Sequence, residues 1–382
     1  MKTNWKRNAI ARLLICCLIV SSLPFGNISM ADASTSQGRE INVVETKLPE
    51  SKDGYIPLAD SMEYTEAELA WLKGADVPEE GGSADGSETI PARFAAVENG
   101  SVSDVAATFP ATRNQGSEGA CWAFAAVAGA EFDLVKEGTH GKDEVDFSEL
   151  QLAYNMYHSA NDKLGNLTGD EWAPTGVESY LDMGGNIAYA QHILASWKGL
   201  TDERHFPYAD RDQYETSAPD SSIATRSDRA RLSDSRQMSL SGNVNDVKSA
   251  IMENGLVQAS YYSNSSYYST SSEGRCVYYC PTAETPNHAV CIVGWDDNFS
   301  VSHFPESARP SNNGAWLIRN SWDTASTEDP FNYFWMSYED ATLDDEVFSL
   351  EFDTPDVYDN IYQYDGSFIR SGVATGKVAN VF

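Results

Sequence analysis

Residues 115–124 read Gln-Gly-Ser-Glu-Gly-Ala-Cys-Trp-Ala-Phe, and they open an apolar, alanine-rich segment that predicts a buried helix over residues 121–137. A thiol at the first turn of a helix feels the positive end of the helix dipole, which lowers its pKa toward thiolate. Gln115 can aim a side-chain N–H at the same point as the backbone N–H of Cys121, and two such donors form an oxyanion hole. A cysteine at a helix start is more often structural, but these flanking residues favour a nucleophile.

Two later motifs supply the partners that a nucleophilic thiol needs. His288 enters an apolar strand expected over residues 288–295, and Asn320 follows a strand expected over residues 315–319. A histidine can exchange the proton of the thiol, and an asparagine oxygen can hold the histidine in one tautomer. Trp322 is close enough in sequence to cover that hydrogen bond from water. The three motifs together predict a cysteine-dependent catalytic site.

These motifs, in this order, resemble the papain-like cysteine peptidases, and the likeness runs from residue 90 to residue 338. The resemblance implies an α+β, two-lobed domain in which a helical lobe and an antiparallel β lobe enclose the active cleft. It implies that Cys121 is the nucleophile, His288 the general acid/base, Asn320 its orienting residue and Gln115 the oxyanion donor.

The resemblance extends to substrate binding, and it also has gaps. It implies that Gly184 and Gly185 bind the substrate backbone and that Trp322 borders the substrate. Smaller matches are Ile90-Pro91, Ser148-Glu149 and Phe206-Pro207-Tyr208. Glu118 stands where the family often has a disulfide cysteine, and Asp323 stands where it has glycine. The departures together resemble a bacterial branch in which a lectin-like β module follows the peptidase.

The remaining apolar periodicity predicts helices first and strands afterwards, the order of an α+β domain in two halves. Helices are expected over residues 148–157, 186–197 and 243–254, and strands over residues 256–262, 288–295, 315–319 and 333–338. Residues 210–240 are rich in Asp, Ser and Arg, so we expect a surface loop there.

The chain divides into four predicted parts. Residues 1–33 combine a basic start, a short apolar run and an Ala-Asp-Ala cleavage pattern, which is typical of a secretory signal peptide. Residues 34–89 are polar and read as a propeptide-like or linker segment, expected to lie against the cleft. The peptidase domain is expected over residues 90–345, and residues 346–382 as the incomplete start of the lectin-like module. We therefore expect a secreted or cell-surface protein.

The composition excludes several partners. The chain has 57 acidic and 26 basic side chains, a formal net charge of −31, so it lacks the cationic surface that nucleic acid requires. Hydrophobic residues make up 41% of the chain, which excludes a wholly disordered protein. After the signal, no segment reaches the roughly 20 apolar residues of a membrane span. The expected partners are a polypeptide substrate and, through the C-terminal module, cell-surface carbohydrate.

The other cysteines and acids have non-catalytic interpretations. Cys276 and Cys280 are expected to form a small disulfide across a turn that borders the cleft, and Cys291 to be a buried thiol. A zinc site at these cysteines and His288 is disfavoured, because His288 and Cys291 alternate to opposite faces of a strand. At residues 296–298, Asp-Asp-Asn, calcium is possible in principle, but a solvated loop is favoured. We expect no metal and no cofactor.

The sequence thus predicts a secreted cysteine peptidase that hydrolyses peptide bonds through a thioester. The alternative is a non-catalytic cell-surface adhesin on the same scaffold, for which the Tyr- and Ser-rich residues 261–279 offer a recognition surface.

Overall fold

The computed structural model describes residues 56–57, 89–157, 181, 184–214, 219–224, 226–322, 332–355 and 373–374. The chain divides into two compact units, one of residues 1–82 with 369–382 and one of residues 83–368. In the first unit, β1 (Ile56–Pro57) pairs antiparallel with β12 (Val373–Ala374). The predicted signal peptide lies outside the described residues, as do nearly all of residues 34–89. The second unit carries the motifs discussed above.

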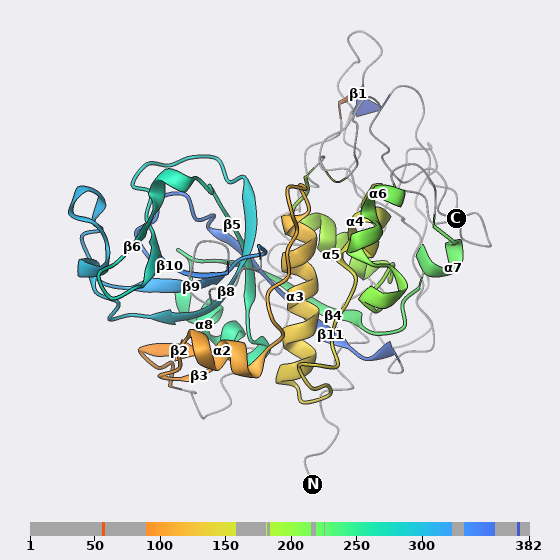
Figure 1. Cartoon of the computed structure of the whole chain (residues 1–382), viewed down its shortest axis with the longest axis horizontal. Helices are drawn as coiled ribbons and strands as arrows, with labels where there is room; N and C mark the ends of the chain where they lie inside the picture. The colour runs from red at the N-terminus through yellow and green to blue at the C-terminus, as the bar shows by residue number, and fades with distance from the viewer. Residues whose placement is uncertain are drawn as a thin grey trace, which may run out of the picture. The chain divides into compact units, whose positions relative to one another are not determined.

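Helix α3 (Cys121–Lys136) is the central element of the second unit, as its sequence predicts. Every residue from Trp122 to Leu134 is buried, because the small alanines let other elements approach on most sides. It packs against strands on one side and against other helices on the opposite side (Figure 1). The other helices are α2 (Val102–Thr108), α4 (Glu149–Tyr157), α5 (Ile187–Ala195), α6 (Arg211–Tyr214), α7 (Ser221–Ala224) and α8 (Val244–Asn254). The three predicted later helices are confirmed at α4, α5 and α8.

Ten strands of the described second unit form one sheet in the order β4-β11-β5-β8-β9-β10-β7-β6, with β2 beside β8 and β3 beside β2. They are β2 (Arg93–Ala95), β3 (Val97–Glu98), β4 (Arg231–Ser239), β5 (Val257–Tyr261), β6 (Tyr268–Thr270), β7 (Cys276–Tyr278), β8 (His288–Asp296), β9 (Ala315–Arg319), β10 (Tyr333–Ser337) and β11 (Glu346–Asp353). All pairs are antiparallel except β7 with β10, which are parallel. Helices and a mostly antiparallel sheet confirm the α+β class.

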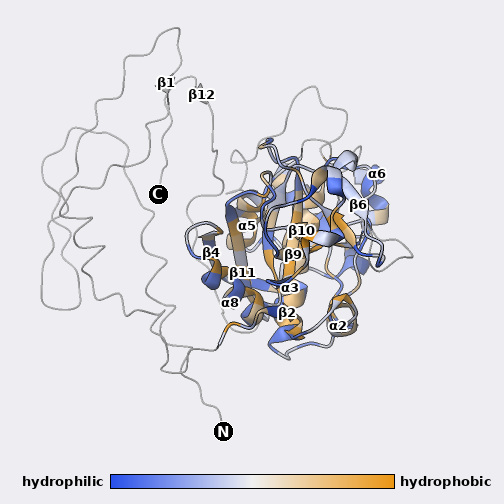
Figure 2. Cartoon of the chain, turned by 90° about the vertical axis from the view of Figure 1, so that its left-hand side faces the viewer, coloured by the Kyte–Doolittle hydropathy of each residue, from blue (hydrophilic) through white to orange (hydrophobic). Residues whose placement is uncertain are grey.

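Two hydrophobic clusters hold these elements together. One surrounds α3 and joins it to α4, α5 and one face of the sheet. The other lies among the strands and includes the buried side chains of Tyr261, Trp295 and Phe334. Each fully buried large apolar side chain contributes about 1.5–3 kcal/mol. Figure 2 shows the hydrophobic residues concentrated on the inner strands, around β9 and β10.

Two expectations about the polar parts of the chain are corrected. Within the supposed surface loop of residues 210–240, β4 is a nine-residue edge strand that pairs with β11. It escapes detection because an edge strand keeps much of its length at the surface and needs no apolar alternation. β11 belongs to the same sheet, so this sheet continues through Asp353, past the residue 345 at which we expected the domain to end.

Candidate active site

The first and second motifs meet where α3 packs against β8. Cys121 is the first residue of α3, and Ala120 before it offers no side-chain cap. The Cys121 Sγ accepts a hydrogen bond of 3.4 Å from the backbone N–H of Ala289. His288, the first residue of β8, precedes that donor directly. The packing thus brings the sulfur to the backbone of the residue after His288, although Cys121 and His288 are 167 positions apart in the chain.

The third motif reaches the histidine through the sheet. β9 runs antiparallel to β8, so Asn320, which follows the last residue of β9, lies beside the start of β8. Nε2 of His288 is 2.7 Å from Oδ1 of Asn320, and both side chains are buried. Because an amide oxygen only accepts, Nε2 carries the hydrogen, and Nδ1 of the neutral ring is left to accept a proton.

Trp322 covers this pair. Its ring stacks on the His288 imidazole with centroids 4.4 Å apart and planes 3° from parallel. The indole Nε1 donates a hydrogen bond of 3.1 Å to the carbonyl of Gly116, which fixes the indole over the imidazole. The sequence expectation that Trp322 shields the histidine–asparagine bond agrees with this stacking.

Gln115 is held by the residue between Asn320 and Trp322. Its Oε1 accepts a hydrogen bond of 2.5 Å from the Ser321 hydroxyl, and its backbone N–H donates one of 2.9 Å to the Ser321 carbonyl. One Nε2 hydrogen is taken by the carbonyl of Glu118 at 2.7 Å. The other amide hydrogen of the buried side chain remains as a donor. The backbone N–H of Cys121 is at the first turn of α3, where N–H groups have no partner within the helix.

The two glycines expected to bind substrate backbone lie against the cysteine loop. A Cβ on Gly185 would be 2.4 Å from the Trp122 ring, and a Cβ on Gly119 would be 2.7 Å from the Leu181 carbonyl and 3.2 Å from the Gly184 nitrogen. Gly184 has a φ of +71°, a conformation that favours glycine. The close approach therefore requires glycine, and it places this backbone next to Cys121.

Burial shifts the pKa values of both Cys121 and His288. Burial raises the pKa of the Cys121 thiol, although hydrogen bonds from backbone N–H groups lower it, so the net direction is opposite to the lowering expected from the helix dipole. Burial also lowers the pKa of His288 to about 4, although the bond to Asn320 raises it. A lone thiolate or a lone imidazolium would be a single buried charge. Each charged form is therefore disfavoured unless an opposite charge lies beside it.

The disulfide expected between Cys276 and Cys280 is not formed in the structure. Cys276 is the first residue of β7, so the backbone that follows it is extended. A disulfide between residues this close in sequence requires a turn that brings their Cα atoms within about 7 Å. The Cys280 thiol donates to the Thr282 carbonyl at 3.2 Å instead.

The remaining cysteine and the acidic loop have other partners. Cys291 is a buried thiol whose pKa burial raises to about 12, in keeping with a packing role. Asp297 accepts 2.6 Å bonds from the Lys248 ammonium and the Tyr338 hydroxyl, which already compensate its charge. In the part of the chain that the structure describes, no three or more His, Cys, Asp or Glu side chains cluster as a metal site would require.

Sequence reasoning missed three supporting residues. Ser321 binds both the backbone and the side chain of Gln115, and its only signal was its place beside Asn320. The Tyr208 hydroxyl donates 2.9 Å to the Gln115 carbonyl, and the aromatic-Pro-Tyr turn was its signal. Glu131, buried in α3, had no signal beyond being a carboxylate in an apolar helix.

Comparison with known proteins identifies the class of this site. The papain family cysteine protease domain matches residues 101–349, which is well over half of the chain. A cysteine protease of Blomia tropicalis is 26% identical over 228 residues, covering 58% of this chain and 56% of the relative. Ananain of Ananas comosus is 25% identical over 212 residues, covering 55% and 48%. The domain is that of a cysteine-type peptidase, a hydrolase.

Similar solved structures are also cysteine proteases. The clostridial cysteine protease Cwp84 after propeptide cleavage has a TM-score of 0.55 and 27% identity, covering 68% of this chain and 59% of that one. The cysteine protease and lectin-like domains of Cwp84, a surface layer associated protein of Clostridium difficile, have a TM-score of 0.55 and 25% identity, covering 83% and 65%. The chain belongs to the papain family and resembles its bacterial branch with a lectin-like domain. The chain spans about half the length of the two curated relatives, 56% of the Blomia tropicalis protease and 48% of ananain.

Proposed function

We propose that this protein is an exported cysteine peptidase whose catalytic residues are Cys121, His288, Asn320 and Gln115. The observation that carries the proposal is the meeting of three distant motifs. The Cys121 sulfur accepts 3.4 Å from the residue after His288, and His288 Nε2 lies 2.7 Å from Asn320 Oδ1. This is the arrangement of nucleophile, base and orienting group that covalent acyl transfer requires.

The first half of the reaction forms a thioester. The Cys121 thiol passes its proton to Nδ1 of His288 as the sulfur attacks the carbonyl carbon of the substrate. The oxygen of that carbonyl becomes negative and accepts hydrogen bonds from the Gln115 Nε2 and from the Cys121 backbone N–H. His288 then gives its proton to the leaving amine, the C–N bond breaks, and the acyl group stays on sulfur.

The second half clears the enzyme. His288, neutral again, takes a proton from water, and the resulting hydroxide attacks the thioester carbon. The same two donors hold the negative oxygen a second time. The C–S bond breaks, the thiolate takes the proton back from His288, and the acid product leaves. Throughout, Asn320 and Trp322 keep the imidazole in one plane and one tautomer, so that Nδ1 faces the sulfur.

The location and the second module extend the proposal. Residues 1–33 support export, and the likeness to Cwp84, a surface layer associated protein, supports a place outside the cell or on its surface. No helix of the described residues has the length and apolar character needed to cross a membrane. We propose that a lectin-like module begins after Asp353 and binds cell-surface carbohydrate, as the second Cwp84 structure pairs such a domain with its protease.

A thiol-directed epoxide probe tests the site. We expect one adduct, mapped to Cys121 by mass spectrometry of peptides, and loss of both labelling and peptide hydrolysis in Cys121→Ala. Cys291→Ala is the matched control, because that thiol is buried behind the same helix with a pKa of about 12 and should leave labelling intact. Labelling at Cys291 or Cys280 with Cys121 untouched would reject the assignment. No labelling and no hydrolysis would favour the adhesin.

A further inference from the structure

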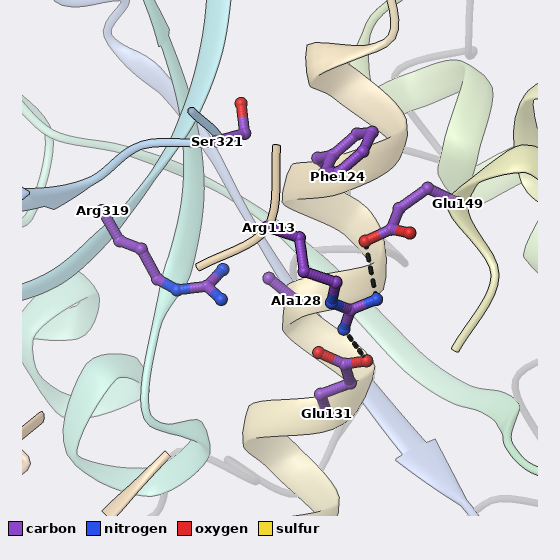
Figure 3. A pocket seen from close by; sticks show the side chains of 7 residues that line it. All are labelled: Arg113, Phe124, Ala128, Glu131, Glu149, Arg319 and Ser321. Atoms are coloured by element: carbon purple, nitrogen blue, oxygen red, sulfur yellow. Dashed lines mark hydrogen bonds and ion pairs between the residues drawn. The ribbon is translucent and has the colours of Figure 1, made fainter. Parts of the chain in front are cut away.

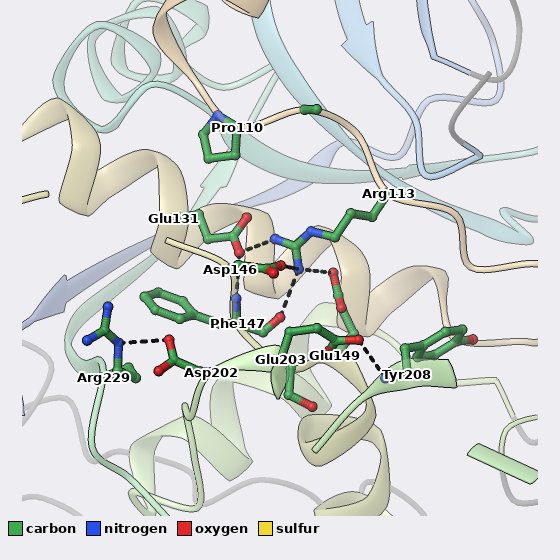
Figure 4. Close-up of polar contacts among 12 residues, drawn as sticks. Pro110, Arg113, Glu131, Asp146, Phe147, Glu149, Asp202, Glu203, Tyr208 and Arg229 are labelled. Atoms are coloured by element: carbon green, nitrogen blue, oxygen red, sulfur yellow. Dashed lines mark hydrogen bonds and ion pairs between the residues drawn. The ribbon is translucent and has the colours of Figure 1, made fainter. Parts of the chain in front are cut away.

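Behind the proposed site, one arginine lies between two buried carboxylates. Arg113 Nη1 is 2.7 Å from Oε1 of Glu149, at the start of α4, and Nη2 binds Oε1 of Glu131 in α3. Nη1 also donates 2.8 Å to the carbonyl of Phe147. Figure 4 shows the guanidinium at the centre of this set of contacts. Both carboxylates are almost completely buried, so each needs a compensating charge.

A second arginine approaches Glu131 from the sheet. Arg319, the last residue of β9, points toward the Arg113–Glu131 pair (Figure 3). Burial raises the pKa of Glu131, and the charge of Arg319 is among the groups that lower it. Arg319, Glu131 and Glu149 line one small cavity of about 10 Å³, roughly the space of a single water molecule. Within the described residues, Glu131 Oε2 and Arg319 Nε have no hydrogen-bond partner.

These two arginines lie close in sequence to two of the proposed catalytic residues. Arg113 is two residues before Gln115, and Arg319 is followed immediately by Asn320. Arg319 Nη2 donates 2.9 Å to the carbonyl of Ala111, which ties the end of β9 to the segment that carries Gln115. The cavity is too small for a substrate or cofactor. Its role must therefore be internal to the protein.

We propose that Glu131 is a positioning residue of the peptidase site, whose carboxylate holds the segments that carry Gln115 and Asn320 through Arg113 and Arg319. The inference rests on the proposed function. One carboxylate in the central helix thereby sets the distance between the oxyanion donor and the residue that orients His288. A small error in that distance misplaces a transition-state contact, whereas substrate binding elsewhere in the cleft is unaffected.

Glu131→Gln tests the inference, with Glu149→Gln as its matched control. Both residues are buried glutamates that pair with Arg113 and line the cavity with Arg319, but Glu131 belongs to the central helix, and Arg319 is among the charges that lower its pKa. We expect both variants to melt at lower temperature than the wild type. Glu131→Gln should also lower kcat by about tenfold or more with KM within about twofold, because displaced catalytic groups cost rate. Glu149→Gln should keep kcat within about threefold of the wild type.

Two further readouts separate positioning from other roles. Glu131→Asp keeps the charge, so we expect it to recover part of the lost kcat. The acid limb of Cys121 alkylation against pH should stay in place in Glu131→Gln, since a purely electrostatic effect on His288 would move it. A lowered melting temperature with unchanged kcat would overturn the proposal, as would equal kcat losses in Glu131→Gln and Glu149→Gln.

A second variant keeps the proposal testable should Glu131→Gln not fold. Arg319→Lys retains the positive charge near Glu131 but loses the fork that also reaches Ala111. We expect kcat to fall about fivefold or more, and an unchanged kcat would overturn the proposal. A wild type without activity and without labelling of Cys121 would instead reject the proposed function.

Discussion

Replacing Asn320 by alanine removes the acceptor that lies 2.7 Å from His288 Nε2. The imidazole is only 6% exposed, so water cannot easily take the place of the lost oxygen. A buried donor left without a partner costs about 1–3 kcal/mol. If that cost falls on the transition state, in which the ring is positively charged, kcat drops about 5- to 150-fold.

Two features of the site decide where in this range the value should fall. The Trp322 ring stacks on His288 at 4.4 Å and keeps the plane of the imidazole after the hydrogen bond is lost. Asn320 Oδ1 also accepts 2.8 Å from the Ser321 backbone, so the variant frees a second donor beside Gln115. We therefore expect a loss of about 10- to 100-fold. His288→Ala, which removes the proton transfer itself, should cost about 100- to 10,000-fold.

The assay is steady-state hydrolysis of a fluorogenic peptide, together with the melting temperature of each variant. Asn254→Ala is a control for stability. Asn254 is the last residue of α8, lies outside the proposed site, is also buried, and donates a hydrogen bond of 2.8 Å to the Ser349 hydroxyl. It should lower the melting temperature without changing kcat. Equal losses of kcat from Asn320→Ala and His288→Ala would refute the orienting role, since the asparagine would then take part in the chemistry.

Three further predictions concern stability and regulation. Burial raises the pKa of Asp133 to about 8, so the stability that this shift contributes is fully present below about pH 4 and is lost as pH rises through about 8. Asp133→Asn should therefore gain melting temperature relative to the wild type as pH rises from 4 to 8, and a constant difference would contradict this. Gly185→Ala should lose about 1–3 kcal/mol of unfolding free energy, because its Cβ would be 2.4 Å from the Trp122 ring; an unchanged denaturant midpoint would count against that contact. A chain beginning at Ile90 should hydrolyse peptide faster than one beginning at Ser34 if the intervening residues slow the enzyme, and equal rates would reject the idea.

The central helix and the inner strands were predictable because almost all of their residues are apolar, and a continuous apolar segment indicates a buried element whatever surrounds it. The helix from Cys121 and the strands from His288 and Ala315 are of this kind, since each is buried along almost its whole length. β4 was missed for the opposite reason. Its polar residues suit a solvated edge, and only the pairing with β11 makes them a strand.

The types of the proposed catalytic residues, and their order along the chain, could be read from the sequence because each motif is a short, local pattern of chemistry. What only the tertiary structure decided is their mutual distance and their protonation. Packing of α3 on β8 and the pairing of β8 with β9 bring the motifs together, and burial then sets the pKa of both Cys121 and His288. The pairing of β7 with β6 and β10 likewise places Cys276 in a strand, and no disulfide joins it to Cys280 in the structure. Desolvation and long-range packing depend on what surrounds a residue in space, and neighbours in sequence do not record that.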